Sequence, residues 1–280
     1  MDEQEHYISV KPSSKSLQNY IAYYYFNFSN RDDYKKRYIF YPHFRNAITV
    51  YKRSKISFSK TGSIVVPDAS KEFEIIYTGI HNESRTGEIK APFDKIGIVF
   101  QPLGINNFMK VPFGDVVTEN PIKDFDYFGN SFEVALKKVY DTNDVDEKVA
   151  VLDAFFKNEF NPLAEARIVK AVNYLFEEDL TIQELSEKLQ LSRKTVLRLF
   201  RKHLNCSPKE FSNLVKFRKA IEIYQKGNSN FTELAYANKY YDQSDFIKHF
   251  KKATGFNPKK FFSGISHLGT EDTFWTLLKN

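Results

Sequence analysis

Cysteine is almost absent from the chain, because Cys206 is the only one among 280 residues. A single cysteine excludes an internal disulfide and provides no cysteine cluster for zinc. No run of 18 apolar residues is present, so the sequence predicts no membrane-spanning helix. The acidic start, Met1-Asp-Glu-Gln-Glu, is unlike a signal peptide. These features favour a cytoplasmic protein, in which Cys206 is a small buried side chain rather than a redox sensor.

Motifs for catalysis are missing as well. The chain contains no Gly-rich phosphate loop and no nucleophile elbow. Its N-terminal histidines, His6, His43 and His81, stand alone, without the His-x-His spacing of a metal site. His43 follows Pro42, which favours a position in a turn over a role as a metal ligand. We therefore predict that the protein is not an enzyme and has no cofactor and no metal site.

Positive charge is unevenly distributed along the chain. Residues 161–280 hold 20 Lys and Arg against 13 Asp and Glu, whereas residues 1–160 hold 21 against 22. Within residues 181–263 the numbers are 17 and 7. A cationic excess confined to one part of a chain indicates a polyanion as the partner of that part. Because 280 residues suffice for two domains, we predict a near-neutral N-terminal domain followed by a basic C-terminal one.

The basic part contains one pattern twice. The first copy is TIQELSEKLQLSRKTVLRLFRKHLNCSPKEF (181–211), and the second is NFTELAYANKYYDQSDFIKHFKKATGFNPKKF (230–261). With one extra residue in the turn of the second copy, Val196 aligns with Phe246 and Arg198 with Lys248. This agreement of residue types indicates a duplicated supersecondary unit.

Each copy is predicted to form two short helices joined by a turn. Thr181 and Glu184 make a capping box at the start of the first helix, and Ser192 is the expected N-cap of the second. One face of this second helix is apolar and the opposite face is cationic, which suits a DNA major groove. A solvated basic face is the alternative for a single helix, but the repeat favours DNA. The predicted DNA-contacting residues are Ser192, Arg193, Lys194, Leu197, Arg198, Arg201, Gln243, Ser244, Lys248 and Lys251.

The segment between the two copies is predicted to be one helix, from Pro208 to Gln225. Ser207 and Glu210 are placed to cap its start, and proline is favoured at the first helical position. A helix of this length spans roughly 27 Å, close to the ~34 Å of one DNA turn. The two groove-facing helices are therefore expected to enter successive major grooves on one face of the DNA.

The motifs SRKTVLRLF, SPKEF, DQSDFIKHF and GFNPKKF, placed in two units joined by a helix, resemble the DNA-binding domain of the AraC/XylS family over residues 166–265. Members usually have glycine in the turn of each unit, where Gln190 and Lys239 stand here, so another turn geometry is expected. Lys248 replaces the arginine that is usual in the second recognition helix, and lysine lacks the two-pronged geometry for guanine. The first unit is therefore expected to recognise its DNA more sharply.

The N-terminal part is predicted to be β-rich. An aromatic strand at 23–28 carries rings that suit either a ligand pocket or a plain core. Residues 1–11 are expected to be loose, and the chain is expected to be helical from 132 to about 160. The segments YYYFNF, YPHFRNAITVY and GIVFQPLGINNFMKVPFGDV resemble a cupin-like subgroup of N-terminal domains in the same family, which implies a sensory or dimerising role. Further strands, bounded by Pro and Gly, are predicted at 38–41, 47–51, 56–58, 63–66, 73–78 and 96–100.

The predicted fold is α+β, with a β-rich, barrel or cupin-like domain at 1–160 and an all-α double helix-turn-helix domain at 161–280. The helix-turn-helix units are expected at about 181–204 and 230–254, around the linker helix 208–225. The predicted function is transcription regulation by sequence-specific binding to double-stranded DNA. The N-terminal domain is expected to form a homodimer through the helix 145–156 and to provide a pocket for a small-molecule effector of unknown identity.

Two other functions are consistent with the same residues. One is a protein-binding adaptor in which the DNA-binding module is vestigial, although the charge excess across 181–263 argues against it. The other is a cupin enzyme with a DNA-binding tail, which would need metal ligands that the isolated histidines do not suggest.

Overall fold

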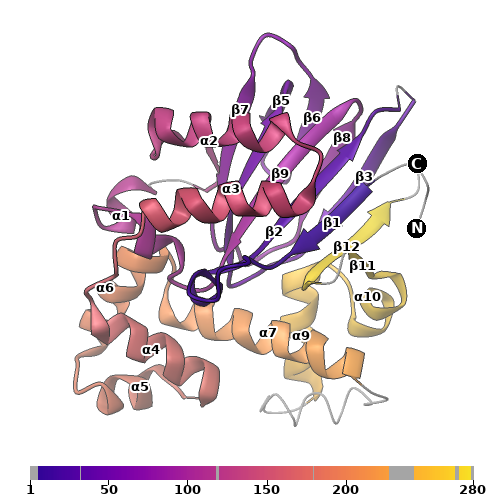
Figure 1. Ribbon diagram of the computed structural model, residues 1–280. Coiled ribbons are helices and arrows are strands. Elements are labelled where there is room, and N and C mark those ends of the chain that lie inside the picture. Colours follow the sequence, from indigo (N-terminus) through magenta and orange to yellow (C-terminus); the bar gives the residue numbers. More distant parts are fainter. Residues whose placement is uncertain are drawn as a thin grey trace.

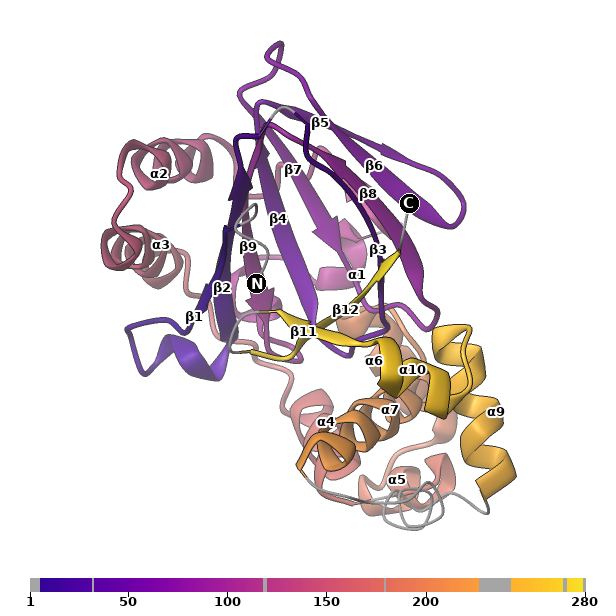
Figure 2. The ribbon, with the colours of Figure 1, turned by 90° about the vertical axis from the view of Figure 1, so that its right-hand side faces the viewer.

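The computed structural model describes residues 6–31, 33–117, 120–178, 180–226, 243–268 and 271–278. Within these residues the strands form two six-stranded sheets that face each other (Figure 2). Neither sheet closes on itself, so the predicted β-rich domain is a sandwich rather than a barrel. Helices cover the outer face of one sheet, and the remaining helices form a separate layer at one end of the sandwich (Figure 1).

The first sheet is antiparallel throughout. Its strands, in spatial order, are β1 (His6–Val10), β2 (Ile21–Ser29), β9 (Phe93–Phe100), β4 (Asn46–Lys52), β7 (Phe73–Thr78) and β10 (Ile122–Lys123). The strands predicted at 23–28, 47–51, 73–78 and 96–100 lie within it. Strand β1 belongs to the segment expected to be loose, because its pairing with β2 is a tertiary contact that local sequence does not encode.

The second sheet contains strands from both ends of the chain. Only the β6–β8 pair is parallel among the strands described there. In spatial order it consists of β11 (Ser266–Leu268), β12 (Thr273–Leu278), β3 (Lys35–Phe40), β8 (Arg85–Lys90), β6 (Gly62–Pro67) and β5 (Ser54–Phe58). Strands β11 and β12 lie in the part expected to be all-α, yet they extend the sheet of the N-terminal part.

Strand β8 was not predicted, because its sequence RTGEIK has no apolar alternation. Gly87 at its centre faces Tyr38 of β3, its register partner. A Cβ atom at Gly87 would come within 2.5 Å of the Tyr38 ring, so only glycine allows the two strands to lie this close. Gly87 therefore makes the strand hard to recognise in the sequence, yet the close packing of β8 against β3 requires glycine there.

Helices α2 (Gly129–Asp141) and α3 (Val145–Asn158) cover the outer face of the first sheet (Figure 2). The sequence predicted one continuous helical stretch here. The chain breaks it because the Asp144 side chain accepts hydrogen bonds from the backbone N–H groups of Asp146 and Glu147 and starts a new helix. Short helical turns lie at η1 (Leu17–Asn19), η2 (Ile105–Phe108) and α1 (Phe113–Val116).

The apolar face of α3 is buried within the chain itself. Val149, Leu152 and Phe156 are fully buried against the first sheet. Each such side chain contributes roughly 1.5–3 kcal/mol through burial. This face therefore belongs to the core and is not available as a dimer surface, which corrects the surface that the sequence suggested. Homodimerisation itself stays a prediction.

The helical layer comprises α4 (Ala166–Glu177), α5 (Ile182–Lys188), α6 (Arg193–Leu204), α7 (Pro208–Lys226), α9 (Gln243–Thr254) and α10 (Pro258–Gly264). Thr181 and Glu184 form the predicted capping box, and the Ser192 hydroxyl accepts from the backbone N–H of Thr195. Ser207 and Glu210 cap α7 in the same reciprocal manner. No helix among the described residues is long and apolar enough to cross a membrane.

The turn of the first unit keeps a left-handed residue. Gln190 has φ = 54°, so the expectation of a different geometry without glycine is wrong at this position. Such a conformation costs a non-glycine residue about 1–2 kcal/mol, which the packing of α5 against α6 must offset. The corresponding turn of the second unit, with Lys239, lies outside the described residues.

Candidate DNA interface and ligand cavity

Helix α6 has one buried and one exposed face, as its sequence predicts. Val196 and Phe200 are fully buried in a core shared with α4, α5 and α7. The other face is exposed to solvent, and even the apolar Leu197 is 42% exposed. This exposed face brings together the first group of predicted DNA-contacting residues, Ser192, Arg193, Lys194, Leu197, Arg198 and Arg201.

Helix α9 repeats this arrangement one unit later. Phe246 and Phe250 are fully buried against Phe217 of α7 and Phe261 of α10. The exposed face carries the second group of predicted residues, Gln243, Ser244, Lys248 and Lys251. The remainder of the second unit, residues 227–242, lies outside the described part of the chain.

Helix α7 connects the two units. It has 19 residues, one more than predicted, and spans roughly 28 Å. Figure 1 shows it running from the side of α6 toward α9. Because Phe211 packs in the core of the first unit and Phe217 in that of the second, one rigid element positions both exposed cationic faces.

A cavity of about 270 Å³ opens between the two sheets, at the end that faces the helices. The aromatic residues of strand β2 point to both of its faces. Tyr23 and Tyr25 line the cavity, whereas Tyr24 and Phe26 point into the core under α2 and α3. Alternate residues of this strand therefore divide between the cavity wall and the core, whereas ligand binding by the cavity stays a prediction.

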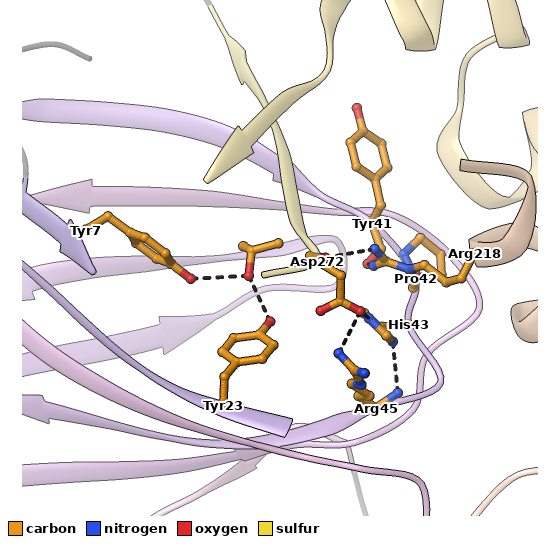
Figure 3. Close-up of polar contacts among 9 residues, drawn as sticks. Tyr7, Tyr23, Tyr41, Pro42, His43, Arg45, Arg218 and Asp272 are labelled. Atoms are coloured by element: carbon orange, nitrogen blue, oxygen red, sulfur yellow. Dashed lines mark hydrogen bonds and ion pairs between the residues drawn. The ribbon is translucent and has the colours of Figure 1, made fainter. Parts of the chain in front are cut away.

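A polar cluster, in which Arg218 is buried and His43, Arg45 and Asp272 are half-buried, joins both halves of the chain at this cavity (Figure 3). The Asp272 carboxylate lies 2.7 Å from His43 Nε2 and 2.7 Å from Arg45 Nη1. His43 Nδ1 accepts the backbone N–H of Arg45, so the ring is a neutral donor to Asp272. Arg218 of α7 donates to the carbonyl oxygens of Tyr41, Pro42 and Asp272 at 3.1, 2.7 and 3.3 Å.

The protonation states of this cluster follow from burial and charge. Burial lowers the pKa of His43 to about 3, assisted by the charge of Arg218. Burial alone would raise the pKa of Asp272, but His43, Arg45 and Arg218 hold it well below its usual range. Burial lowers the pKa of Arg218 to about 10, so its guanidinium is charged at neutral pH. The cluster thus contains two cations, one carboxylate and a neutral imidazole.

Comparison with known proteins identifies the type of domain that the helical layer forms. A family described as a helix-turn-helix domain matches residues 185–264. The Msm operon regulatory protein of Streptococcus mutans is 26% identical over 101 residues, which cover 36% of each chain. An uncharacterised HTH-type transcriptional regulator of Bacillus subtilis, YdeC, is 26% identical over 98 residues, or 34% of each chain. The C-terminal unit is an AraC-type helix-turn-helix domain.

The remaining comparisons concern the rest of the chain. The matched segment spans only about a third of the length of these regulators. Residues 9–120 match a domain of unknown function, DUF6597. The structure of ToxT from Vibrio cholerae strain SCE256 with a bound unsaturated fatty acid has a TM-score of 0.47. It is 13% identical, with 97% of this chain and all of that one covered.

The N-terminal part holds the C-terminal end of each recognition helix of the AraC-type domain. Near the end of α6, the Asn106 side chain donates to the carbonyl of His203 at 3.0 Å. The backbone N–H of Ser84 donates to Ala253 at the end of α9, also at 3.0 Å. Gly114 lies so close to α6 that a Cβ atom there would come within 2.9 Å of the Lys202 carbonyl oxygen. Both recognition helices are therefore in direct contact with the N-terminal part.

Sequence alone did not reveal the polar cluster. His43 and His81 form an isolated β-bridge, although they looked unrelated in the sequence. Asp272 and Arg218 reach His43 only because the C-terminal segment returns to the β-sandwich. Within the described residues, no group of three or more His, Cys, Asp and Glu side chains is placed to hold a metal ion. Cys206 is buried, as predicted.

We expect acid to destabilise the protein through His81. Burial, with the charge of Arg85, lowers the pKa of His81 to about 4. The folded state thus favours the neutral ring, and the stabilisation is full above the unfolded pKa of ~6.5 and lost as the pH falls toward 4. Urea unfolding at pH ~6.5 and ~4.5 measures how much the free energy of unfolding falls on acidification. This decrease should be about 2 kcal/mol smaller in His81→Gln than in the wild type. His6→Gln, at an exposed position of β1, should retain the wild-type loss, and equal losses in all three proteins would contradict this assignment.

Proposed function

We propose that the protein is a cytoplasmic transcription regulator that binds double-stranded DNA through α6 and α9. The observation that carries the proposal is the exposed cationic face on the second helix of an AraC-type helix-turn-helix unit, repeated at the other side of α7. A helix that buries one face and exposes cations on the other matches the major groove in shape and charge. The names of the related regulators agree with this function.

The residues in contact with DNA divide into two proposed roles. Arg193, Lys194 and Arg198 of α6 are placed for base edges or nearby phosphates, and Arg201 for phosphate. Gln243, Ser244 and Lys248 are their counterparts on α9, with Lys251 on phosphate. Ser192 caps α6 and is exposed at the end that enters the groove, and Leu197 offers an apolar contact to thymine methyl groups.

Control by a small-molecule effector is the second part of the proposal. The cavity borders α7 through Arg218, and the recognition helices are hydrogen-bonded to the β-sandwich. A ligand that favours one arrangement of these contacts changes the affinity for DNA by its differential affinity for the two arrangements. The ligand thus acts on the interface that orients α6 and α9.

The proposal predicts a salt-dependent DNA complex whose sequence preference depends on Arg198. Electrophoretic shifts on a selected binding site should weaken as salt rises, because phosphate contacts release counterions. Arg198→Ala should cost ~1–3 kcal/mol and relax the preference at one base position. Arg198→Lys should keep the charge but lose much of the discrimination.

Two outcomes would contradict these roles. If both Arg198 variants weaken binding equally to every sequence, Arg198 contacts phosphate and does not recognise a base. If the wild type binds no DNA at low salt and instead captures a protein through its N-terminal part, the chain is an adaptor with a vestigial module.

A further inference from the structure

Strand β12 is part of the cavity wall although it comes from the C-terminal end of the chain. Thr273 and Trp275 line the cavity, and Trp275 pairs with Phe40 of β3. The indole stacks on the Tyr38 ring, with centroids 4.1 Å apart and planes 9° from parallel. Trp275 is the only tryptophan in the chain.

The start of β12 also contacts the opposite sheet. The hydroxyl of Thr273 lies 3.2 Å from that of Tyr7 on β1 and 2.8 Å from that of Tyr23 on β2 (Figure 3). Trp275 meets Tyr7 edge to face, with ring centroids 6.3 Å apart. Because β12 is hydrogen-bonded to β3 in one sheet and its side chains reach β1 and β2 in the other, it bridges the two walls of the cavity.

Strand β12 is connected to the DNA-binding unit through its neighbour β11. Helix α10 ends at Gly264 and β11 begins at Ser266. Phe261 of α10 packs against Phe250 of α9, with ring centroids 4.9 Å apart. A displacement of β12 therefore acts on the end of the second helix-turn-helix unit through a short segment and a shared core.

The charge of the lining indicates the class of ligand. Asp272 is the single carboxylate among the lining residues, and it is already paired with His43 and Arg45. Ten of the lining residues are tyrosine, phenylalanine or isoleucine, and together with the lining cations they make the cavity favour an apolar body and a negative charge. The lining cations are Arg45, Lys60, Arg85, Lys95 and Arg218.

We propose that the cavity binds a small organic anion with an apolar body, and that β12 supplies the wall, through Thr273 and Trp275, by which this ligand acts on the DNA-binding unit. This inference rests on the proposed effector site. The ligand fills the space between β2 and β12, which stabilises the pairing of β12 with β3. The second unit is then held in the position that the structure shows.

The test uses the full chain and two matched probes, 3-phenylpropionate and its uncharged amide, 3-phenylpropionamide. Calorimetry should give at least ten-fold tighter binding for the carboxylate. Trp275→Ala should weaken carboxylate binding at least ten-fold, whereas Leu277→Ala, at an exposed position of β12 outside the cavity, should leave it unchanged. In the wild type, the carboxylate should shift the emission of Trp275 and slow hydrogen exchange of the β12 amides.

Three results would overturn the inference. Equal affinity for the two probes, or binding of neither at millimolar concentration, excludes an anion site. An unchanged Trp275 emission together with full binding by Trp275→Ala excludes β12 as its wall. DNA binding is measured separately. If the protein binds DNA but shows none of the expected effects of the probes, the inference about the ligand site is wrong while the proposed DNA-binding function stands. Probe binding as expected, in a protein that shifts no DNA, defeats the proposed regulatory function and leaves the site in place.

Discussion

Replacing Arg218 with methionine is expected to lower the free energy of unfolding by about 3–5 kcal/mol, because hydrogen bonds from a charged donor contribute about 1.5–3 kcal/mol each. The guanidinium is buried and donates to three carbonyl oxygens, those of Tyr41, Pro42 and Asp272. Methionine preserves the apolar stem but leaves these acceptors without their donor. It also removes a cation that stabilises the Asp272 carboxylate. Urea unfolding followed by circular dichroism measures the change.

Lys209→Met is the matched control, because Lys209 lies in the first turn of the same helix and is exposed. Its effect should stay within ~0.5 kcal/mol, as for most surface substitutions. Arg218→Lys should fall between the two, because an ammonium keeps the charge but not the planar geometry that reaches three carbonyls. A change below ~1 kcal/mol in Arg218→Met would show that these contacts do not hold α7 to the β-sandwich.

The importance of Arg218 illustrates what sequence can and cannot predict in this chain. The helices of the AraC-type unit that lie within the described residues were predicted closely, because their caps and apolar spacing are local. Thr181 with Glu184, and Ser207 with Glu210, form the contacts that their spacing implies. The role of Arg218, in contrast, has no local signal in the sequence. Its partners lie 176 and 177 residues earlier in the chain and 54 residues later, and no local pattern indicates them.

Strands of the β-sandwich were predicted where their own residues favour a strand and missed where pairing alone defines them. Strands such as β4 and β7 carry continuous β-branched and aromatic residues, so their propensity is evident. Strands β8 and β12 depend on neighbours distant in sequence. The cavity, too, could be predicted only in part. The spacing of Tyr23 and Tyr25 shows that they share a face, but the opposing wall includes Trp275, about 250 residues later in the chain.

One chain is expected to protect two DNA segments about 10 base pairs apart, on one face of the double helix. Helix α7 spans roughly 28 Å, and the width of the helices it joins brings this close to the ~34 Å between successive major grooves. The site should be asymmetric, because α6 presents arginines where α9 presents lysines. Hydroxyl-radical footprinting of the full chain on a selected site would show two protected segments, the one under α6 having the more defined sequence.

Two matched sets of substitutions assign each segment to its helix. Replacing Arg193, Lys194 and Arg198 by alanine should reduce affinity at least ~100-fold, at ~1 kcal/mol or more per contact, and should abolish the preference for the specified segment. Replacing Lys248, Lys251 and Lys252 by alanine should weaken binding to all sequences and remove protection of the second segment, while the first stays specified. All six side chains are exposed, so both variants should fold as the wild type does. Protection of one groove only in the wild type, or a palindrome that requires two chains, would show that α9 does not reach the second groove.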